Sequence, residues 1–225
     1  MNLVKFFAVA GRLASLSRFS MERLISRESV LEHTGFVAML SWALSSEINA
    51  ISTNAGGPPL VHVGVCLEKA LAHDMEEIIT GDIARPTKYS SQEALLLFKS
   101  LSASAIRTVA ESLDEQPHFG HTIIERNTAA KQGREGTIVA ISDMLAVVYK
   151  VWDEVIVHGN KTLVRQAIVV RQQIANYRSK VTLEFSGEPL LFLLSVLDQA
   201  EFIAREAASY EEPLLGTLVE KVIAE

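Results

Sequence analysis

Residues 71–89, L-A-H-D-M-E-E-I-I-T-G-D-I-A-R-P-T-K-Y, place an imidazole and several carboxylates close together in the chain. His73 and Asp74 are adjacent, and Glu77 follows four residues after the histidine. Because positions i and i+4 share one face of an α-helix, we expect His73 and Glu77 to point the same way, with Asp74 turned aside. Such a group suits a hard-to-borderline divalent metal ion and the water that it activates. The alternative is a helix end whose acidic side chains are solvated.

Asp143 is the one acid within a strongly apolar segment, I-V-A-I-S-D-M-L-A-V-V-Y-K-V-W at 138–152. Burying a carboxylate is unfavourable unless it is paired or binds a cation. Asp143 could therefore cap another helix or meet an arginine. Two histidines and two aspartates from separate helices could instead converge into a nitrogen and oxygen site. Such a site suits Mn, Co, Zn, Mg or Ni, and the sequence does not rank these ions.

Helical spacing and capping signals predict the elements that position these side chains. Ser29 and Glu32 form a capping box, which opens a long helix with His33 in its first turn. No segment shows sustained alternation of apolar and polar residues, so we predict an all-α fold, with the β-branched run 138–151 as the place where a strand would be the alternative. The predicted helices cover 3–16, 29–51, 60–79, 92–113, a short stretch near Ile123, 137–158, 161–180, a segment from about 188 to 208, and a short final helix; the loops include 17–27, 52–59 and a turn at 114–120 around Pro117.

The bulk composition bounds the class of protein. The chain has 225 residues, of which 48% are apolar and 21% charged, as expected for a globular domain. The net charge of −6 gives no reason to expect nucleic acid or an anionic membrane as a partner. Cys66 is the only cysteine, and no uncharged run reaches the length of a membrane span, so we expect a cytoplasmic protein. We predict one domain over 1–225, with the C-terminal helices (about 188–225) as an appended packing or oligomerisation element.

The order of these residues resembles that of the HD-domain phosphohydrolases. His33, the pair His73-Asp74 and Asp143 stand in the order H…HD…D. Arg18-Phe19 ahead of Glu32-His33, and the pattern H-D-x-x-E-x-x-T-G-D-x-x-x-P-x-K-Y from His73 to Tyr89, resemble the bacterial 5′-deoxynucleotidase branch and the related phage dATP triphosphohydrolases. The resemblance covers roughly residues 5–180.

The resemblance implies an HD-domain helical bundle with a divalent metal at its centre. It assigns metal binding to His33, His73, Asp74 and Asp143. It makes Glu77 the residue that orients or deprotonates the attacking water, with Asp82 as a second acid or orienting group. Arg18 would grip the substrate phosphate, and Lys88 could contribute there. Phe19 stands where close relatives often carry tryptophan against the sugar or base, so selectivity could shift; loop packing is the alternative for this residue.

Three functions follow from this pattern. The first is hydrolysis of the 5′-phosphate of 2′-deoxynucleoside monophosphates, and the second is release of triphosphate from a deoxynucleoside triphosphate such as dATP. Both need the same ion and water. The third is a non-catalytic nucleotide-sensing or assembly module, against which the presence of Glu77 argues, since a sensor does not need a residue that activates water. The expected partners are a small deoxynucleotide and further copies of the same chain, as a dimer or larger homo-oligomer.

Overall fold

The computed structural model describes residues 3–113 and 117–210, and over these ranges it contains helices and one isolated β-bridge, between Ser17 and Ser29. The all-α prediction is therefore confirmed. The α-helices are α1 (Leu3–Ser15), α2 (Val30–Asn54), α3 (Val63–Ala72), α4 (Glu77–Thr80), α5 (Arg85–Lys88), α6 (Gln92–Ser112), α7 (Pro117–Thr128), α8 (Gly133–Val151), α9 (Val164–Glu184) and α10 (Gly187–Ala208); η1 (Trp152–Val157) is a π-helix and η2 (Lys161–Leu163) a 3₁₀-helix.

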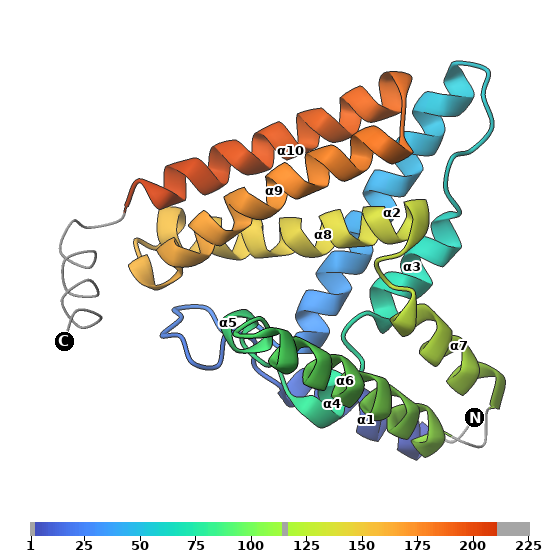
Figure 1. Cartoon of the computed structure of the whole chain (residues 1–225), viewed down its shortest axis with the longest axis vertical. Helices are drawn as coiled ribbons and strands as arrows, with labels where there is room; N and C mark the ends of the chain where they lie inside the picture. The colour runs from blue at the N-terminus through green and yellow to red at the C-terminus, as the bar shows by residue number, and fades with distance from the viewer. Residues whose placement is uncertain (1–2, 114–116, 211–225) are drawn as a thin grey trace.

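The helices form two groups around the long helix α2. Helices α9 and α10 pack side by side over α8, and α2 packs against both α3 and α8 (Figure 1). At the other end of the molecule, α4 packs on α1 and α6, and α6 packs on α7. The largest apolar core joins α2, α3, α8, α9 and α10; its fully buried members include Ile48, Cys66, Ile141, Ile174 and Leu193. This core fixes the three segments that carry the predicted metal ligands relative to one another.

The start of α2 follows the predicted capping box. The Ser29 hydroxyl accepts a hydrogen bond from the Glu32 N–H at 3.1 Å, and the Glu32 carboxylate accepts one from the Ser29 N–H at 2.7 Å. These bonds satisfy N–H groups that the first helical turn leaves unpaired. The helix continues to Asn54, three residues beyond its predicted end, and His33 in its first turn is completely buried.

The predicted continuous helix over 60–79 is wrong. Helix α3 ends at Ala72, a turn follows, and α4 begins only at Glu77. The carbonyl groups that would continue the helix bind elsewhere: the Asn127 amide from α7 donates to Ala72 O at 2.8 Å and to His73 O at 3.3 Å. His73 and Glu77 therefore do not share a face of one helix. Gly81, with a φ of 72°, ends α4 as predicted, because this left-handed conformation suits glycine.

Further boundaries also differ from the prediction: α8 begins at Gly133 instead of 137, and α9 runs over Val164–Glu184 instead of 161–180. Pro117 starts helix α7 instead of lying in a turn, as the fixed φ of proline suits the first position of a helix. The apolar segment 138–151 is helical, but the last turns of the predicted helix to 158 are the π-helix η1. Residues 114–116 and the predicted short final helix lie outside the described residues. Within the described ranges, each helix is too short or too polar to cross a lipid bilayer.

Candidate metal centre and the Arg18 loop

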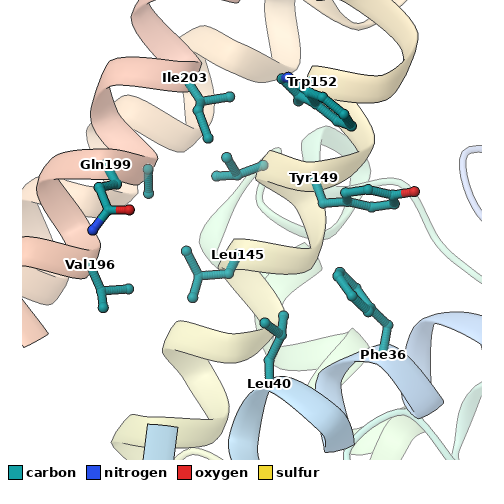
Figure 2. A pocket seen from close by; sticks show the side chains of 10 residues that line it. Phe36, Leu40, Leu145, Tyr149, Trp152, Val196, Gln199 and Ile203 are labelled. Carbon is teal, nitrogen blue, oxygen red and sulfur yellow. The ribbon is translucent and has the colours of Figure 1, made fainter. Parts of the chain in front are cut away.

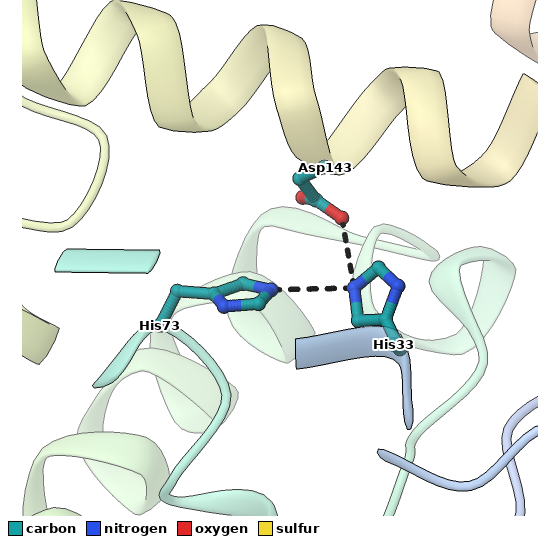
Figure 3. Close-up of side chains that lie close together, drawn as sticks. All are labelled: His33, His73 and Asp143. Carbon is teal, nitrogen blue, oxygen red and sulfur yellow. Dashed lines mark hydrogen bonds and ion pairs between the residues drawn. The ribbon is translucent and has the colours of Figure 1, made fainter. Parts of the chain in front are cut away.

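The structure brings the four predicted metal ligands together. Nε2 of His33 lies 3.3 Å from Nε2 of His73 and 3.3 Å from Oδ1 of Asp143 (Figure 3). Oδ2 of Asp74 lies 3.0 Å from His73 Nε2 and 3.6 Å from His33 Nε2. Two ring nitrogens and two carboxylate oxygens thus face a common point. One donor atom each of His33, His73 and Asp143 can be chosen so that all three lie within 4.8 Å of one another.

Different elements supply these ligands. His33 comes from the first turn of α2, and Asp143 from the middle of α8. His73 and Asp74 come from the turn after α3, where the ring of His73 is oriented by a 2.6 Å contact between its Nδ1 and the carbonyl of Ala70. If Nδ1 carries the ring proton in this contact, Nε2 keeps its lone pair directed into the cluster, as in many metal-binding histidines. The break in the helix therefore serves to aim His73.

His73 and Asp74 each stabilise the charged form of the other. Burial opposes ionisation of Asp74, but the His73 ring next to it holds the pKa of Asp74 below its ordinary value. Burial also disfavours a charged His73, yet Asp74 raises the pKa of His73 above its ordinary value. The carboxylates are therefore ionised at neutral pH in the absence of any ion. Two ionised carboxylates beside two imidazoles form a donor set of the kind that divalent metals bind.

Lys131 is a cation at this site that the sequence analysis missed. Its Nζ lies 2.5 Å from Oδ2 of Asp143, on the side of the carboxylate away from His33. Burial opposes the charge of Asp143, but Lys131 and His33 keep the pKa of Asp143 well below its ordinary value. The expected alternatives for Asp143 were a helix cap or an arginine, and the observed cation is a lysine. Lys131 lies in the turn before α8, so only the folded chain brings it to Asp143.

Glu77 lies beside the cluster with one oxygen free. Its side chain is 4% exposed, and Oε2 is buried without a hydrogen-bond partner, whereas Oε1 lies 3.6 Å from Nζ of Lys88. Burial, and then the charges of Asp74 and Asp82, raise the pKa of Glu77 to about 9. A buried oxygen without a partner is unusual and indicates a missing water or ligand. A carboxyl group with this pKa keeps its proton at neutral pH, and a cation bound nearby would lower the pKa so that the group could serve as a general base.

Arg18 reaches the same cluster from the loop between α1 and α2. Its Nη1 lies 2.7 Å from Nδ1 of His33 and 2.9 Å from Oε2 of Glu28. A guanidinium can only donate, so in the metal-free chain Nδ1 of His33 accepts this bond and Nε2 carries the ring proton; a metal bound at Nε2 would require the proton to lie on Nδ1 and this contact to break. The Arg18 guanidinium also lies over the ring of Phe19, 5.1 Å from its centroid. The loop therefore delivers a cation to the edge of the ligand cluster, and Glu28 is a partner that the sequence analysis did not find.

Phe19 and Asp82 fix the conformation of this loop. Phe19 has a φ of 51°, and it is the only described non-glycine residue with a positive φ. Its N–H donates to Oδ2 of Asp82 at 3.0 Å, and its ring packs against the apolar cluster of η1, η2 and α9. The structure thus shows loop packing for Phe19 and a backbone contact for Asp82. The roles predicted for both residues toward substrate stay predictions.

The residues present fit a divalent metal. The donor set is two imidazoles and two ionised carboxylates, and a buried carboxylate oxygen without a partner lies beside it. An ion bound between these donors would relieve the repulsion between the carboxylates, and a water on that ion could meet Glu77.

Comparisons with known proteins agree with this geometry. The family described as 5′-deoxynucleotidase YfbR-like matches residues 5–188. The chain belongs to this family. It is 25% identical over 211 residues to the 5′-deoxynucleotidase YfbR of Salmonella typhi, covering 93% of this chain and 98% of that protein. It is 31% identical over 151 residues to a 5′-deoxynucleotidase of Vibrio cholerae, covering 66% and 74% of the two chains.

Solved structures show the same fold. The chain superposes on the crystal structure of an HD-domain phosphohydrolase from Listeria innocua with a TM-score of 0.68, at 23% identity, covering 98% of this chain and 99% of that one. The predicted HD-domain architecture is therefore confirmed, and membership of the YfbR-like family identifies the chain as a hydrolase.

Proposed function

We propose that this protein is a metal-dependent 5′-deoxynucleotidase, which removes the 5′-phosphate from 2′-deoxynucleoside monophosphates. The observation that carries the proposal is the convergence of His33, His73, Asp74 and Asp143 at one point beside a buried general base, Glu77. The substrate class is supported by the names of the relatives that match most of the chain. The second candidate, triphosphate release from dATP or another dNTP, becomes an outcome of the test below.

The four clustered side chains would hold the ion. When bound, a divalent cation lowers the pKa of its water and draws charge from a phosphoryl oxygen. Glu77 would take a proton from the attacking water at Oε2 and return it to the departing 5′-oxygen as the phosphorus–oxygen bond breaks, while Lys88, 3.6 Å from Oε1, would hold the carboxyl group in place. The donor set suits Co, Mn, Zn, Mg or Ni, and metal content after purification would decide among them.

Arg18 is the residue that we assign to the phosphate. Its guanidinium already lies at the edge of the cluster, and its fork of donors matches the oxygens of a phosphate group. Phe19 next to it would offer its ring to the sugar or base, and Asp82, which holds the Phe19 backbone in place, would act as the additional acid. Lys88, which pairs with Glu77, would add positive charge near the phosphate group.

The test is a product assay on the metal-loaded protein. Each 5′-dNMP is incubated with it, and inorganic phosphate is measured with malachite green; each dNTP is incubated in parallel and triphosphate is separated by ion exchange. Phosphate from dNMPs, abolished by EDTA and restored by one of the five metals, is the expected result. Triphosphate from dNTPs alone would favour the second candidate. Release of neither product by a metal-loaded sample would favour the sensing or assembly module.

We also propose that the protein forms a homo-oligomer through an apolar groove between α2, α8 with η1, and α10. The groove has a volume of about 280 Å³ and is lined by Phe36, Leu40, Tyr149, Trp152 and Ile203, among other residues (Figure 2). The rings of Phe36, Tyr149 and Trp152 contact one another, and Tyr149 and Trp152 are 45% and 39% exposed. An exposed apolar patch of this kind is typical of a protein–protein interface. Helix α10 would then contribute both to this interface and to the main apolar core, which contains its Leu193 and Leu197.

Light scattering after size exclusion tests this assembly. Tyr149→Glu should shift the mass toward the monomer, whereas Phe7→Glu, at a more exposed aromatic residue on α1, should not. An unchanged mass in Tyr149→Glu would remove the groove from the interface.

We also propose a cytoplasmic location. It is supported by the substrate class and by the single cysteine, Cys66, whose thiol is buried.

A further inference from the structure

The loop between α1 and α2, residues 16–29, is held at both of its ends and at one distant point. At its ends, Arg18 N–H donates to Glu28 O at 2.9 Å and Val30 N–H donates to Leu16 O at 2.9 Å. These bonds close the base of the loop; toward its far half, residues 23–26, Glu22 N–H donates to Phe19 O, Leu24 N–H donates to Glu22 O, and Leu24 packs on the apolar cluster that includes Val155. What holds this half determines how firmly Arg18 is aimed at the metal-ligand cluster.

Glu154 of η1 binds the far half of the loop. Its Oε2 accepts the N–H of Ile25 at 2.9 Å, and its Oε1 accepts the N–H of Ser26 at 2.9 Å. Each oxygen has a second donor, the Asn160 amide at 2.6 Å and the Lys150 ammonium at 3.0 Å. The Glu154 carboxylate is completely buried, and its acceptor sites are filled by these four donors.

Lys150 and Asn160 extend the same contact to the loop carbonyls. Lys150, which is 2% exposed, donates to Ser26 O as well as to Glu154. Asn160 donates to Arg23 O at 2.8 Å while it also binds Glu154. The loop thus meets a carboxylate with its N–H groups and an ammonium and an amide with its carbonyls. The position of the loop relative to α8 and η1 is therefore fixed at Arg23, Ile25 and Ser26.

A buried ion pair is a poor means of adding stability, since apolar residues of similar volume often do as well or better. The pair instead orients the loop, because each of its hydrogen bonds fixes the distance and angle of one loop peptide group. Burial opposes ionisation of Glu154, but the two loop N–H groups, Asn160 and Lys150 hold the pKa of Glu154 at about 2. The bonds to the charged carboxylate therefore outweigh its desolvation.

The helix that carries this pair also carries a metal ligand. Asp143 lies in α8, and α8 continues without a break into η1 with Glu154, eleven residues and about 16 Å further on. The continuous helix therefore positions both the ligand cluster and the loop that ends in Arg18. A π-helix inserts an extra residue into a turn and is frequent at functional sites, and here it contains Glu154.

We propose that Lys150 and Glu154 are positioning residues for Arg18: they fix residues 23–26 on the helix of Asp143 and so hold the guanidinium at the distance from the metal centre that a bound phosphate requires. The proposal rests on the proposed function only for the assignment of Arg18 to the phosphate. Neither residue touches the substrate, and their effect reaches the reaction through the loop.

The first arm of the test needs no substrate. Amide hydrogen exchange over residues 19–28 is compared in the wild type, Glu154→Gln, and the matched control Glu201→Gln, which removes a carboxylate that pairs with Arg178 between α9 and α10. We expect exchange at Ile25 and Ser26 to rise at least about tenfold in Glu154→Gln, because their acceptor is weakened, and to stay unchanged in Glu201→Gln. Unchanged exchange in Glu154→Gln would overturn the proposal.

The second arm is a double-mutant cycle with Arg18 on a dNMP. Glu154→Gln should lower kcat/KM about tenfold, mainly through KM, with wild-type metal content, and should have an effect of less than about twofold in an Arg18→Ala background. Equal losses in both backgrounds would mean that Glu154 acts independently of Arg18, and would overturn the proposal. Lys150→Met, which keeps the Glu154 carboxylate, should give a smaller loss with the same dependence on Arg18 and serves if Glu154→Gln does not fold.

Failure of the proposed function is recognised separately. A wild-type protein that releases no phosphate from any dNMP contradicts the deoxynucleotidase, whatever the exchange data show. Active wild-type protein with unchanged exchange or additive losses contradicts the positioning role alone.

Discussion

Asp143 and Glu154 are two carboxylates on one continuous helix, yet they have opposite surroundings. Glu154 is saturated: four donors fill its two oxygens, and all four belong to or bind the loop at residues 23–26. Asp143 faces His33, with the carboxylate of Asp74 close by, and the buried Oε2 of Glu77 near them has no partner. Lys131 compensates only part of this negative charge.

The difference separates a scaffold from a site. A buried acid whose bonds are complete can only hold what it binds, and removing it loosens structure. A group of acids and imidazoles with unmet acceptors gains free energy from a cation and a water. The predictions below test whether the two carboxylates differ in this way, from the largest expected effect to the smallest.

The largest effect is expected at Asp143. Asp143→Ala removes a ligand and should abolish turnover, with metal content reduced to a small fraction of the wild-type value. Mass spectrometry of the purified protein measures the metal, and phosphate release measures turnover. Glu201→Gln, an acid removed elsewhere, should change neither. A fully loaded Asp143→Ala protein would contradict its role as a ligand.

Glu77 should separate turnover from metal binding. Glu77→Gln keeps the shape of the side chain but cannot accept a proton, so turnover should fall by about 10²–10⁴-fold at wild-type metal content. Single-turnover kinetics on the metal-loaded variant measures the loss. If the variant keeps wild-type turnover, the proton acceptor is another group.

Arg18 should affect binding of the phosphate. Its loss removes hydrogen bonds between charged groups, which are worth about 1.5–3 kcal/mol each, so kcat/KM in Arg18→Ala should fall roughly 10–100-fold, mainly through KM. Steady-state kinetics with a dNMP measures this loss. Unchanged KM and kcat would assign Arg18 to structure, through its contacts with Glu28 and His33.

The smallest effect concerns stability at low pH. The pKa of Glu154 is about 2 in the folded chain against an ordinary value of 4.5, so its stabilising contribution is complete above pH 4.5 and is lost as the pH falls toward about 2. The difference in free energy of unfolding between the wild type and Glu154→Gln should therefore shrink over this range. Urea unfolding at several pH values measures it. A difference that does not change with pH would show that the charge of Glu154 does not stabilise the fold.

Local patterns in the sequence were enough for much of the fold. The capping box at Ser29, the apolar period of the helices and Gly81 act through neighbouring residues, so the all-α class and the bounds of α1, α6 and α10 could be predicted. The break after Ala72 could not, because the amide that binds the Ala72 carbonyl there belongs to Asn127, 55 residues away in the chain. The spacing of His73 and Glu77 therefore pointed to two residues of the same site, but the shared helix face that it predicted is wrong.

The site, too, contains residues that the sequence indicated and residues that only the folded chain brings together. The order H…HD…D pointed to the residues that the structure clusters, although their role as ligands stays a prediction. Lys131 gave no signal, since its contact with Asp143 depends on the turn before α8. Lys150 and Glu154 are visible as an i, i+4 pair in an apolar helix, but their partners are backbone groups more than 120 residues earlier. Only the folded chain shows what they hold.

Anomalous diffraction from crystals of the Mn²⁺-loaded protein would compare the two carboxylates most directly. We expect one strong peak at about 2.0–2.3 Å from Nε2 of His33 and of His73 and from the carboxylates of Asp74 and Asp143, and none within coordination distance of Glu154. A map without a peak between His33, His73 and Asp143, from protein that retains the metal, would contradict the metal centre and the reaction assigned to it.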